Sequence, residues 1–204
     1  MKEIIKLGGI SILCGGVFFI ITNALLTPFI DFKASFSEVA NSEIFLYRMI
    51  SAAFTVFFLL IATPGIYLYQ NKRNSKFGFV AFLIAFAGGT FLFANEWYQV
   101  FILPEIAASS PDAIDLLDSS GSFSTYDFGA FLALITFTVG WLLIAIHLIR
   151  SGFKPRITPG LIIAGFFLIP ILSAIISPSI GGAIGSTVLG LGFIAIGIRI
   201  LQQT

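Results

Sequence analysis

Long apolar stretches recur along the chain and alternate with short polar segments. Six of these stretches approach the length of about 20 residues that a helix needs to cross the hydrocarbon of a bilayer. Each is expected to be helical, because an open strand would leave backbone hydrogen-bonding groups unpaired in lipid. The predicted spans are residues 7–30, 44–69, 77–103, 127–149, 159–176 and 178–201. The pattern therefore predicts an all-α integral membrane bundle of six transmembrane helices, forming a single domain over residues 1–204.

Two connections between the predicted spans, residues 31–43 and 104–126, are long enough to hold structure of their own. The first contains Ser35-Phe36-Ser37-Glu38, a capping-box pattern that starts helices. In the second, Ser110-Pro111 precedes an acidic stretch, residues 113–118, that suits a short helix. We expect the two connections to lie on the same side of the bundle and to form a lid together.

Composition excludes a water-soluble domain. Of the 204 residues, 57% are hydrophobic and 10% are charged, whereas about 25% are charged in an ordinary soluble domain. The chain begins with a short basic segment, as a signal peptide does, but the apolar stretch that follows is too long for one. We expect this stretch to be retained as the first span.

The charged residues are divided between the two sides of the predicted membrane. Nine of the 11 basic residues fall on the side of both termini: Lys2, Lys6, Lys72, Arg73, Lys76, Arg150, Lys154, Arg156 and Arg199. Only Lys33 and Arg48 fall on the other side, together with nine of the 10 acidic residues. The positive-inside rule therefore predicts that this multi-pass protein has cytoplasmic amino and carboxyl termini.

Glu96 is the one acidic residue that lies within a predicted span away from its ends. An ionised carboxylate near hydrocarbon costs on the order of 3 kcal/mol, so such a residue marks a candidate functional site and calls for a partner on another helix. Counted from Phe77, it lies about 28 Å along the third span, in the outer half of the membrane. Other polar residues reach the same level, and we predict a polar pocket in which Arg48 pairs with Glu96 or Asp127. The candidate ligand-binding residues are Asn23, Tyr47, Arg48, Asn95, Glu96, Tyr98, Gln99, Tyr126 and Asp127.

Two blander interpretations of Glu96 remain open. The third span is longer than the hydrocarbon, so Glu96 could lie at the water interface, with Trp97 and Tyr98 in an aromatic belt. Alternatively, Arg48 and a carboxylate could form a purely structural clamp between helices. These interpretations require no ligand.

Other kinds of chemistry have little support. Cys14 and His147 are the only residues of their types, so the usual ligand sets for zinc or haem are missing, and we expect no metal and no cofactor. Motifs for a serine nucleophile, a metalloprotease or a phosphate-binding loop are also absent. The basic connections carry too few charges for nucleic acid, and contact with anionic membrane lipids explains them better.

Small residues recur every four positions in the last span. Ser177, Gly181 and Gly185 form one stripe, and Gly182, Ser186 and Gly190 form the next. Such stripes let helices approach closely in lipid. They favour packing within the bundle, and a homo-oligomer through this Gly-rich span is the alternative.

Two patches of the sequence resemble a known group of proteins. Residues 42–70 place Tyr47-Arg48 at the start of a span that ends in Gly-Ile-Tyr-Leu-Tyr. Residues 140–165 contain the turn Arg150-Ser151-Gly152-Phe153-Lys154-Pro155-Arg156 between Gly-Trp-Leu-Leu-Ile-Ala and Gly160-Leu-Ile-Ile-Ala-Gly165. These patches resemble a family of small bacterial membrane proteins that is defined only as a domain of unknown function, with a cytoplasmic turn of the form Arg-Ser-Gly-x-x-Pro-Arg. The resemblance implies about six spans in a bacterial inner membrane and implies no activity.

These patterns leave several function classes open. The first is a non-enzymatic membrane protein whose outer-half pocket binds an apolar or amphiphilic molecule or a membrane partner subunit. The second is a membrane-embedded enzyme that uses Glu96 or Asp127 as general acid or base and Arg48 to stabilise an anion. The third, a transporter or channel subunit, is less favoured because strongly polar residues are missing from the middle of several spans.

Overall fold

The computed structural model describes residues 1–70, 75–119 and 124–204, without the side chains of residues 116–119. The predicted basic residues Lys72 and Arg73 and the side chain of Asp118 lie outside the described residues. Within these described ranges, six helical segments are long and apolar enough to cross a membrane, which confirms the predicted all-α bundle. Their bounds are α1 Lys2–Ile20 with its extensions η1 Ile21–Leu26 and η2 Thr27–Phe29, α3 Glu43–Gln70, α4 Lys76–Phe101, α7 Thr125–Arg150, α8 Ile157–Ile175 and α9 Pro178–Leu201.

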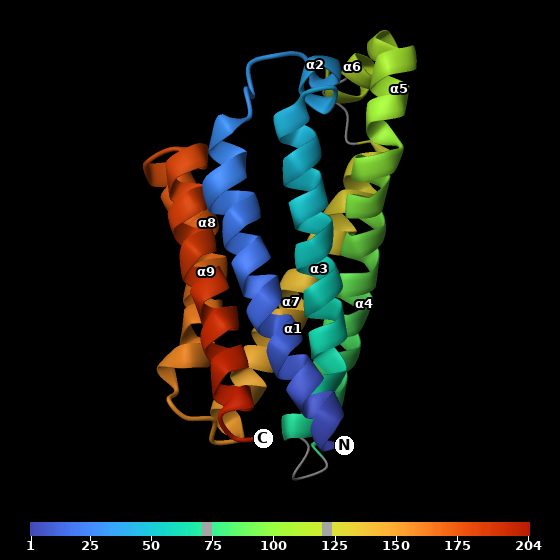
Figure 1. Ribbon diagram of the computed structural model, residues 1–204. Coiled ribbons are helices and arrows are strands. Elements are labelled where there is room, and N and C mark those ends of the chain that lie inside the picture. Colours follow the sequence, from blue (N-terminus) through green and yellow to red (C-terminus); the bar gives the residue numbers. More distant parts are fainter. Residues whose placement is uncertain (71–74, 120–123) are drawn as a thin grey trace.

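The six long helices form a ring in the order α8, α9, α1, α3, α4 and α7. Each neighbouring pair packs extensively, except that α7 and α8, which close the ring, touch over a smaller region. The centre of the ring on the side of the termini is filled by a tight core that includes Trp141, Phe193 and Ile196. Both termini lie at this end of the bundle (Figure 1).

Close approach of the helices depends on glycine. A Cβ atom built on Gly8 of α1 would lie 2.7 Å from the Cα atom of Gly65 in α3. In α9, Cβ atoms on Gly181 and Gly185 would collide with the backbone of α8, and one on Gly190 with the side chain of Ile20. These glycines of the last span are buried by contacts within the chain. A homo-oligomer through this span stays a prediction.

Three short helices cover the end of the bundle away from the termini: α2 Phe36–Ala40, α5 Leu103–Ser109 and α6 Pro111–Ser119. We call them the acidic cap. The predicted capping box starts α2, because Ser35 Oγ accepts from Glu38 N while Glu38 Oε2 accepts from Ser35 N. Asp115 of α6 accepts hydrogen bonds from Ser37 N at 2.8 Å and Ser37 Oγ at 2.9 Å, which ties the two predicted outer connections together. A second apolar core, including Met49, Leu103 and Ile114, lies beneath them.

The turn after α7 has a geometry that explains its sequence. Gly152 adopts φ +86°, a left-handed conformation that glycine takes without strain. Phe153 N donates to Leu148 O and Gly152 N donates to Ile149 O, the hydrogen bonds of a Schellman motif. Phe153, 5% exposed, then turns back into the core. The motif reverses the chain and leads it into α8.

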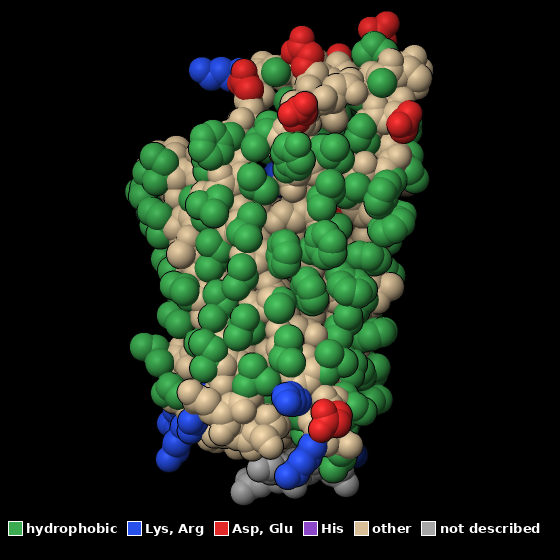
Figure 2. Space-filling model, in the orientation of Figure 1, with side chains coloured by type: hydrophobic (Ala, Val, Ile, Leu, Met, Phe, Trp, Pro, Cys, Tyr) green, Lys and Arg blue, Asp and Glu red, His purple; other side chains and the backbone are tan. Residues whose placement is uncertain are grey.

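The surface is banded by residue type. Figure 2 shows apolar side chains around the middle of the bundle, acidic ones gathered at the acidic cap and mainly basic ones at the end with the termini. The band is what six helices in hydrocarbon require, and the charges at its two ends differ in sign as the sequence predicted.

Candidate functional site

The first membrane helix changes its winding where the candidate site begins. Residues Ile21–Leu26 form a π-helical segment, in which the wider turns alter the backbone hydrogen bonding. Here Thr22 Oγ1 donates to Ser51 Oγ of α3 at 2.8 Å, and Asn23 Nδ2 donates to Phe19 O at 3.0 Å. The segment therefore places two polar side chains on the inner side of the ring.

A cavity of about 470 Å³ lies inside the ring, in the half of the bundle next to the acidic cap. All six long helical segments contribute to its wall. Its volume falls in the range of about 300–1,000 Å³ that is usual for small-molecule sites. Most of the wall is aliphatic or aromatic. The polar lining residues are Thr22, Asn23, Arg48, Thr55, Glu96, Thr138 and Ser186.

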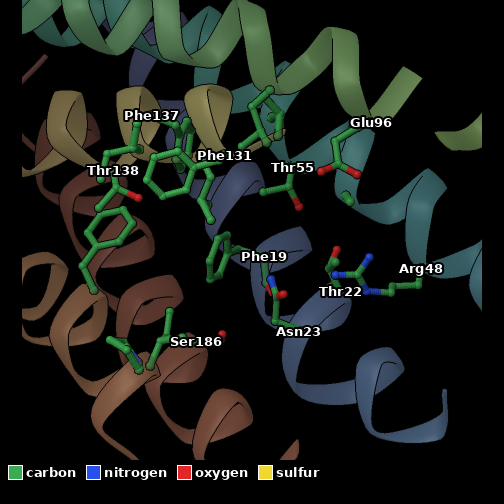
Figure 3. A pocket seen from close by; sticks show the side chains of 18 residues that line it. Phe19, Thr22, Asn23, Arg48, Thr55, Glu96, Phe131, Phe137, Thr138 and Ser186 are labelled. Atoms are coloured by element: carbon green, nitrogen blue, oxygen red, sulfur yellow. The ribbon is translucent and has the colours of Figure 1, made fainter. Parts of the chain in front are cut away.

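The charged residues gather at one part of this wall. Figure 3 shows the guanidinium of Arg48 beside Thr22 and Asn23, with the carboxyl group of Glu96 facing the same space from α4. Arg48 Nε donates to Thr27 Oγ1 at 3.0 Å, and its Nη1 donates to Met49 Sδ at 3.2 Å. Thr27 Oγ1 in turn donates to Thr22 O at 2.8 Å, so Arg48 is anchored to the end of the π-helical segment.

Glu96 has no such anchor. Its Oε2 atom is buried and has no hydrogen-bond partner among the described residues. Arg48 and Glu96 line the same cavity, but within the described part of the chain no hydrogen bond or ion pair joins them. A buried carboxyl oxygen without a partner is costly and calls for an explanation, such as a polar group that occupies the cavity.

The cavity opens sideways between α7 and α8. Four of its lining residues are exposed, and all of them lie on these two helices: Phe131, Leu134, Ile135 and Pro170. Every lining residue from α1, α3, α4 and α9 is buried or half-buried. The helices α7 and α8 also make the smallest contact in the ring, so the opening lies on the apolar side of the bundle.

Three of the nine predicted site residues line this cavity: Asn23, Arg48 and Glu96. Another three, Asn95, Tyr98 and Tyr126, line a separate shallow groove between α4 and α7. Tyr47 is 57% exposed, and Gln99 is half-buried without lining the cavity. The difference arises from direction around the helix axis: residues next to one another on a helix point about 100° apart.

Asp127 belongs to a helix cap and does not line the cavity. Its Oδ2 atom accepts from Ser124 N at 2.9 Å and from Ser124 Oγ at 2.7 Å, while Asp127 N donates to Ser124 Oγ at 3.1 Å. These bonds form a capping box at the start of α7. The predicted pairing of Arg48 with Asp127 is wrong: among the described residues Asp127 Oδ2 bonds to Ser124, whereas Arg48 bonds to Thr27 and Met49.

Trp97 and Glu96, which the interfacial interpretation placed together, lie on different faces of α4. Trp97 is 52% exposed and packs along the outside of α4 against Phe93 and Phe101. Glu96, the preceding residue, points about 100° away around the helix axis, and its Oε2 is buried. The tryptophan thus faces outward while the carboxyl group faces the interior of the bundle.

Several lining residues were missed by sequence reasoning. Thr22, Thr55 and Thr138 lie in apolar spans, and Ser186 was interpreted only as a small packing residue. Hydroxyl groups are poor indicators of a site, because in helices they commonly bond to the carbonyl four residues earlier, as Thr55 does to Ser51 O. The signal that could have identified them is their depth: counted along their spans, these residues lie about as far from the membrane surface as Glu96 does.

Comparisons of this chain with models of protein families, with curated proteins and with solved structures found no match. The resemblance of residues 42–70 and 140–165 to an uncharacterised bacterial family therefore stays a prediction. The candidate site is interpreted from its own geometry.

Proposed function

We propose that this protein binds an apolar or amphiphilic molecule from the membrane within the cavity of its helical bundle. The observation that carries the proposal is the buried, unpartnered Oε2 atom of Glu96 at the polar end of an otherwise apolar cavity. Apolar walls with a few convergent polar groups are typical of sites for small molecules. The sideways opening supports a ligand that dissolves in lipid.

The arrangement gives less support to catalysis. Of the two carboxyl groups considered as general acid or base, Asp127 caps α7 through Ser124 and lies outside the cavity, which leaves Glu96 with Arg48. A transporter would need a polar route to both sides of the membrane. On the side of the termini, the ring is instead filled by Trp141, Phe193 and their neighbours. Binding without chemical conversion is therefore the function we propose.

The proposal includes a location. We place the protein in the inner membrane of a bacterial cell with both termini in the cytoplasm, so that the cavity lies in the outer half of the bilayer. The basic residues at the end with the termini and the acidic cap at the other end support this orientation.

The test is a thermal-shift screen of the detergent-purified protein against lipids, quinones and terpenoids. A ligand present at 100 times its Kd stabilises a protein by about 2.7 kcal/mol, which shifts the melting temperature measurably. A variant with a filled cavity, Thr138→Phe, is expected to lose the shift, because Thr138 lines the cavity. Val139→Phe is the matched control. Val139 is the next residue along α7, its side chain is 39% exposed, and it does not line the cavity.

A compound that stabilises the parent and Val139→Phe but not Thr138→Phe supports the proposal. Compounds that shift all three proteins equally act through the detergent or the outer surface. If every stabilising compound behaves in that way, the cavity is not a binding site and the proposed function is wrong.

A further inference from the structure

The polar end of the cavity has a specific hydrogen-bonding demand. Glu96 Oε2 needs a donor, since it is buried without one among the described residues. Arg48 has donors to spare, because a guanidinium carries five N–H groups and its described bonds use one on Nε and one on Nη1. A hydroxyl group meets both demands, as its O–H donates to the carboxyl oxygen while its oxygen accepts from the guanidinium.

The charges of the two residues argue against a charged ligand. An anionic head group would be attracted by Arg48 but would face the carboxylate of Glu96. A cationic head group would be attracted by Glu96 and would face Arg48. Either ion would also lose its hydration on leaving the membrane surface. An uncharged head group avoids both penalties.

The shape of the cavity indicates where the rest of the ligand lies. Five of the seven polar lining residues, including Arg48 and Glu96, lie on the first membrane helix, α3 and α4, whereas the exposed lining residues lie on α7 and α8. A ligand whose head group reaches Glu96 would therefore run past Phe131 and Leu134 towards the lipid. Its apolar chain need not fit entirely within about 470 Å³, because the far end extends into hydrocarbon.

We infer that the ligand is an uncharged amphiphile with a hydroxyl head group and a long apolar chain, and that it reaches the cavity laterally from the membrane between α7 and α8. The inference rests on the proposed function and specifies its ligand class. The hydroxyl binds between Glu96 and Arg48, and the chain occupies the opening.

Photoaffinity labelling of the full-length protein in lipid nanodiscs tests this inference. The probes are 1-hexadecanol, hexadecanoic acid and hexadecylamine, each with the same photoreactive diazirine in the chain, and labelled peptides are identified by mass spectrometry. The alcohol is expected to label residues of α7, α8 and α9 around the cavity at least about tenfold more than the acid or the amine, a ratio typical of one well-placed hydrogen bond.

A pair of variants links this preference to Glu96. Glu96→Leu removes the acceptor and is expected to abolish the preference for the alcohol. Glu105→Leu, a change of the same kind at an exposed residue of the acidic cap, should leave the preference intact. The comparison of the three probes on the parent protein does not depend on how well Glu96→Leu folds.

A second pair tests the route. Leu134→Trp places a larger side chain at the opening. Labelling by the alcohol is expected to slow by about tenfold or more, because the association rate falls when the entry path is obstructed. Val139→Trp, on the same helix outside the cavity wall, should leave the rate unchanged. An unchanged rate in Leu134→Trp overturns the lateral route.

The outcomes separate the inference from the proposed function. Equal cavity labelling by the three probes, or stronger labelling by the acid or the amine, overturns the head-group assignment while binding in the cavity stands. If none of the probes labels the cavity of a protein that also fails the thermal-shift screen, the proposed function itself is wrong. Preferential labelling by the alcohol, lost only in Glu96→Leu, supports the full inference.

Discussion

Thr27 holds together the polar end of the cavity. Its hydroxyl group accepts from Arg48 Nε at 3.0 Å and donates to Thr22 O at 2.8 Å, so one side chain joins the guanidinium to the π-helical segment. Without this acceptor, Arg48 would have a partly buried N–H group with no partner and more freedom to move away from the cavity. Thr27 therefore shares with Met49, which accepts from Arg48 Nη1, the task of holding the guanidinium in place.

We predict that Thr27→Val destabilises the protein by about 1–3 kcal/mol, the usual cost of leaving a buried polar group unsatisfied. The substitution preserves the shape of the side chain, so packing is nearly unchanged. Ligand binding should weaken as well, because Arg48 loses its anchor. Thermal denaturation in detergent measures the first effect and the photoaffinity probes measure the second.

Thr90→Val is the control for this substitution. Thr90 is exposed on α4, and its hydroxyl group bonds only to Phe86 O within its own helix. Its replacement should change the melting temperature little and should not affect binding. Equal melting of Thr27→Val and Thr90→Val would show that Arg48 does not depend on Thr27.

The sequence predicted site residues correctly where their position along the helix axis alone decided whether they line the cavity. The levels of Asn23, Arg48 and Glu96 within their spans follow from a rise of about 1.5 Å per residue, and these residues do line one cavity. The angular direction of a side chain depends on which neighbours surround the helix, and no periodic pattern marks it in spans that are apolar on all sides. For that reason Asn95 and Tyr98 were grouped with Glu96 although they line a different groove.

At the scale of elements, the start of α7 is set by a reciprocal pair of hydrogen bonds. Ser124 caps the backbone N–H of Asp127, and Asp127 caps that of Ser124. The sequence contains this Ser-x-x-Asp pattern, but Asp127 was interpreted through its apparent depth in the membrane instead. An acidic residue in the first turn of a helix is better explained first by capping and by the helix dipole.

We predict that Ser124→Ala and Asp127→Ala each destabilise the protein by about 0.5–2 kcal/mol, the usual cost of losing a helix cap. The double variant should cost less than the sum of the single variants, because both remove the same pair of interactions. Neither should change labelling of the cavity, since neither residue lines it. Denaturation and photoaffinity labelling of the three variants provide the measurement. Loss of labelling in Asp127→Ala alone would show that Asp127 takes part in ligand binding.

The long helices were predictable because lipid restricts the alternatives. Length and hydropathy alone locate six spans whose ends lie close to those of the helices. The π-helical segment Ile21–Leu26 was not predicted, since its residues are ordinary for a membrane helix. The third predicted span, which ends at residue 103, stops within two residues of the end of α4 at Phe101, but α5 Leu103–Ser109, with Pro104 in its first turn, was not predicted.

At the scale of the whole molecule, the order of the helices around the ring creates the site. The helix α1 packs extensively against α9 on one side and α3 on the other. The helices α7 and α8 follow one another in the chain, yet they make the smallest contact of any neighbouring pair in the ring. The Gly152 turn joins them at the end with the termini, so the two helices are held together there and separated near the acidic cap. Helix order cannot be obtained from apolar patterns, and the lateral opening follows from that order.

The orientation of the bundle decides which half of the membrane supplies the ligand. The termini lie at one end and the acidic cap at the other, with the cavity next to the cap. Basic residues near the termini favour a cytoplasmic location for that end. We therefore predict that the opening faces the outer half of the bilayer, where it would exchange molecules with the outer leaflet.

Cysteine labelling in intact cells measures this orientation. In a Cys14→Ala background, which removes the only native cysteine, Glu105→Cys in the acidic cap should react with a membrane-impermeant maleimide, because Glu105 is exposed. Thr204→Cys at the carboxyl terminus should react only after the cells are permeabilised. The reverse pattern would place the cap in the cytoplasm and the opening in the inner half of the bilayer. The chemistry of the site would be unchanged, but its ligand would then come from the cytoplasmic leaflet.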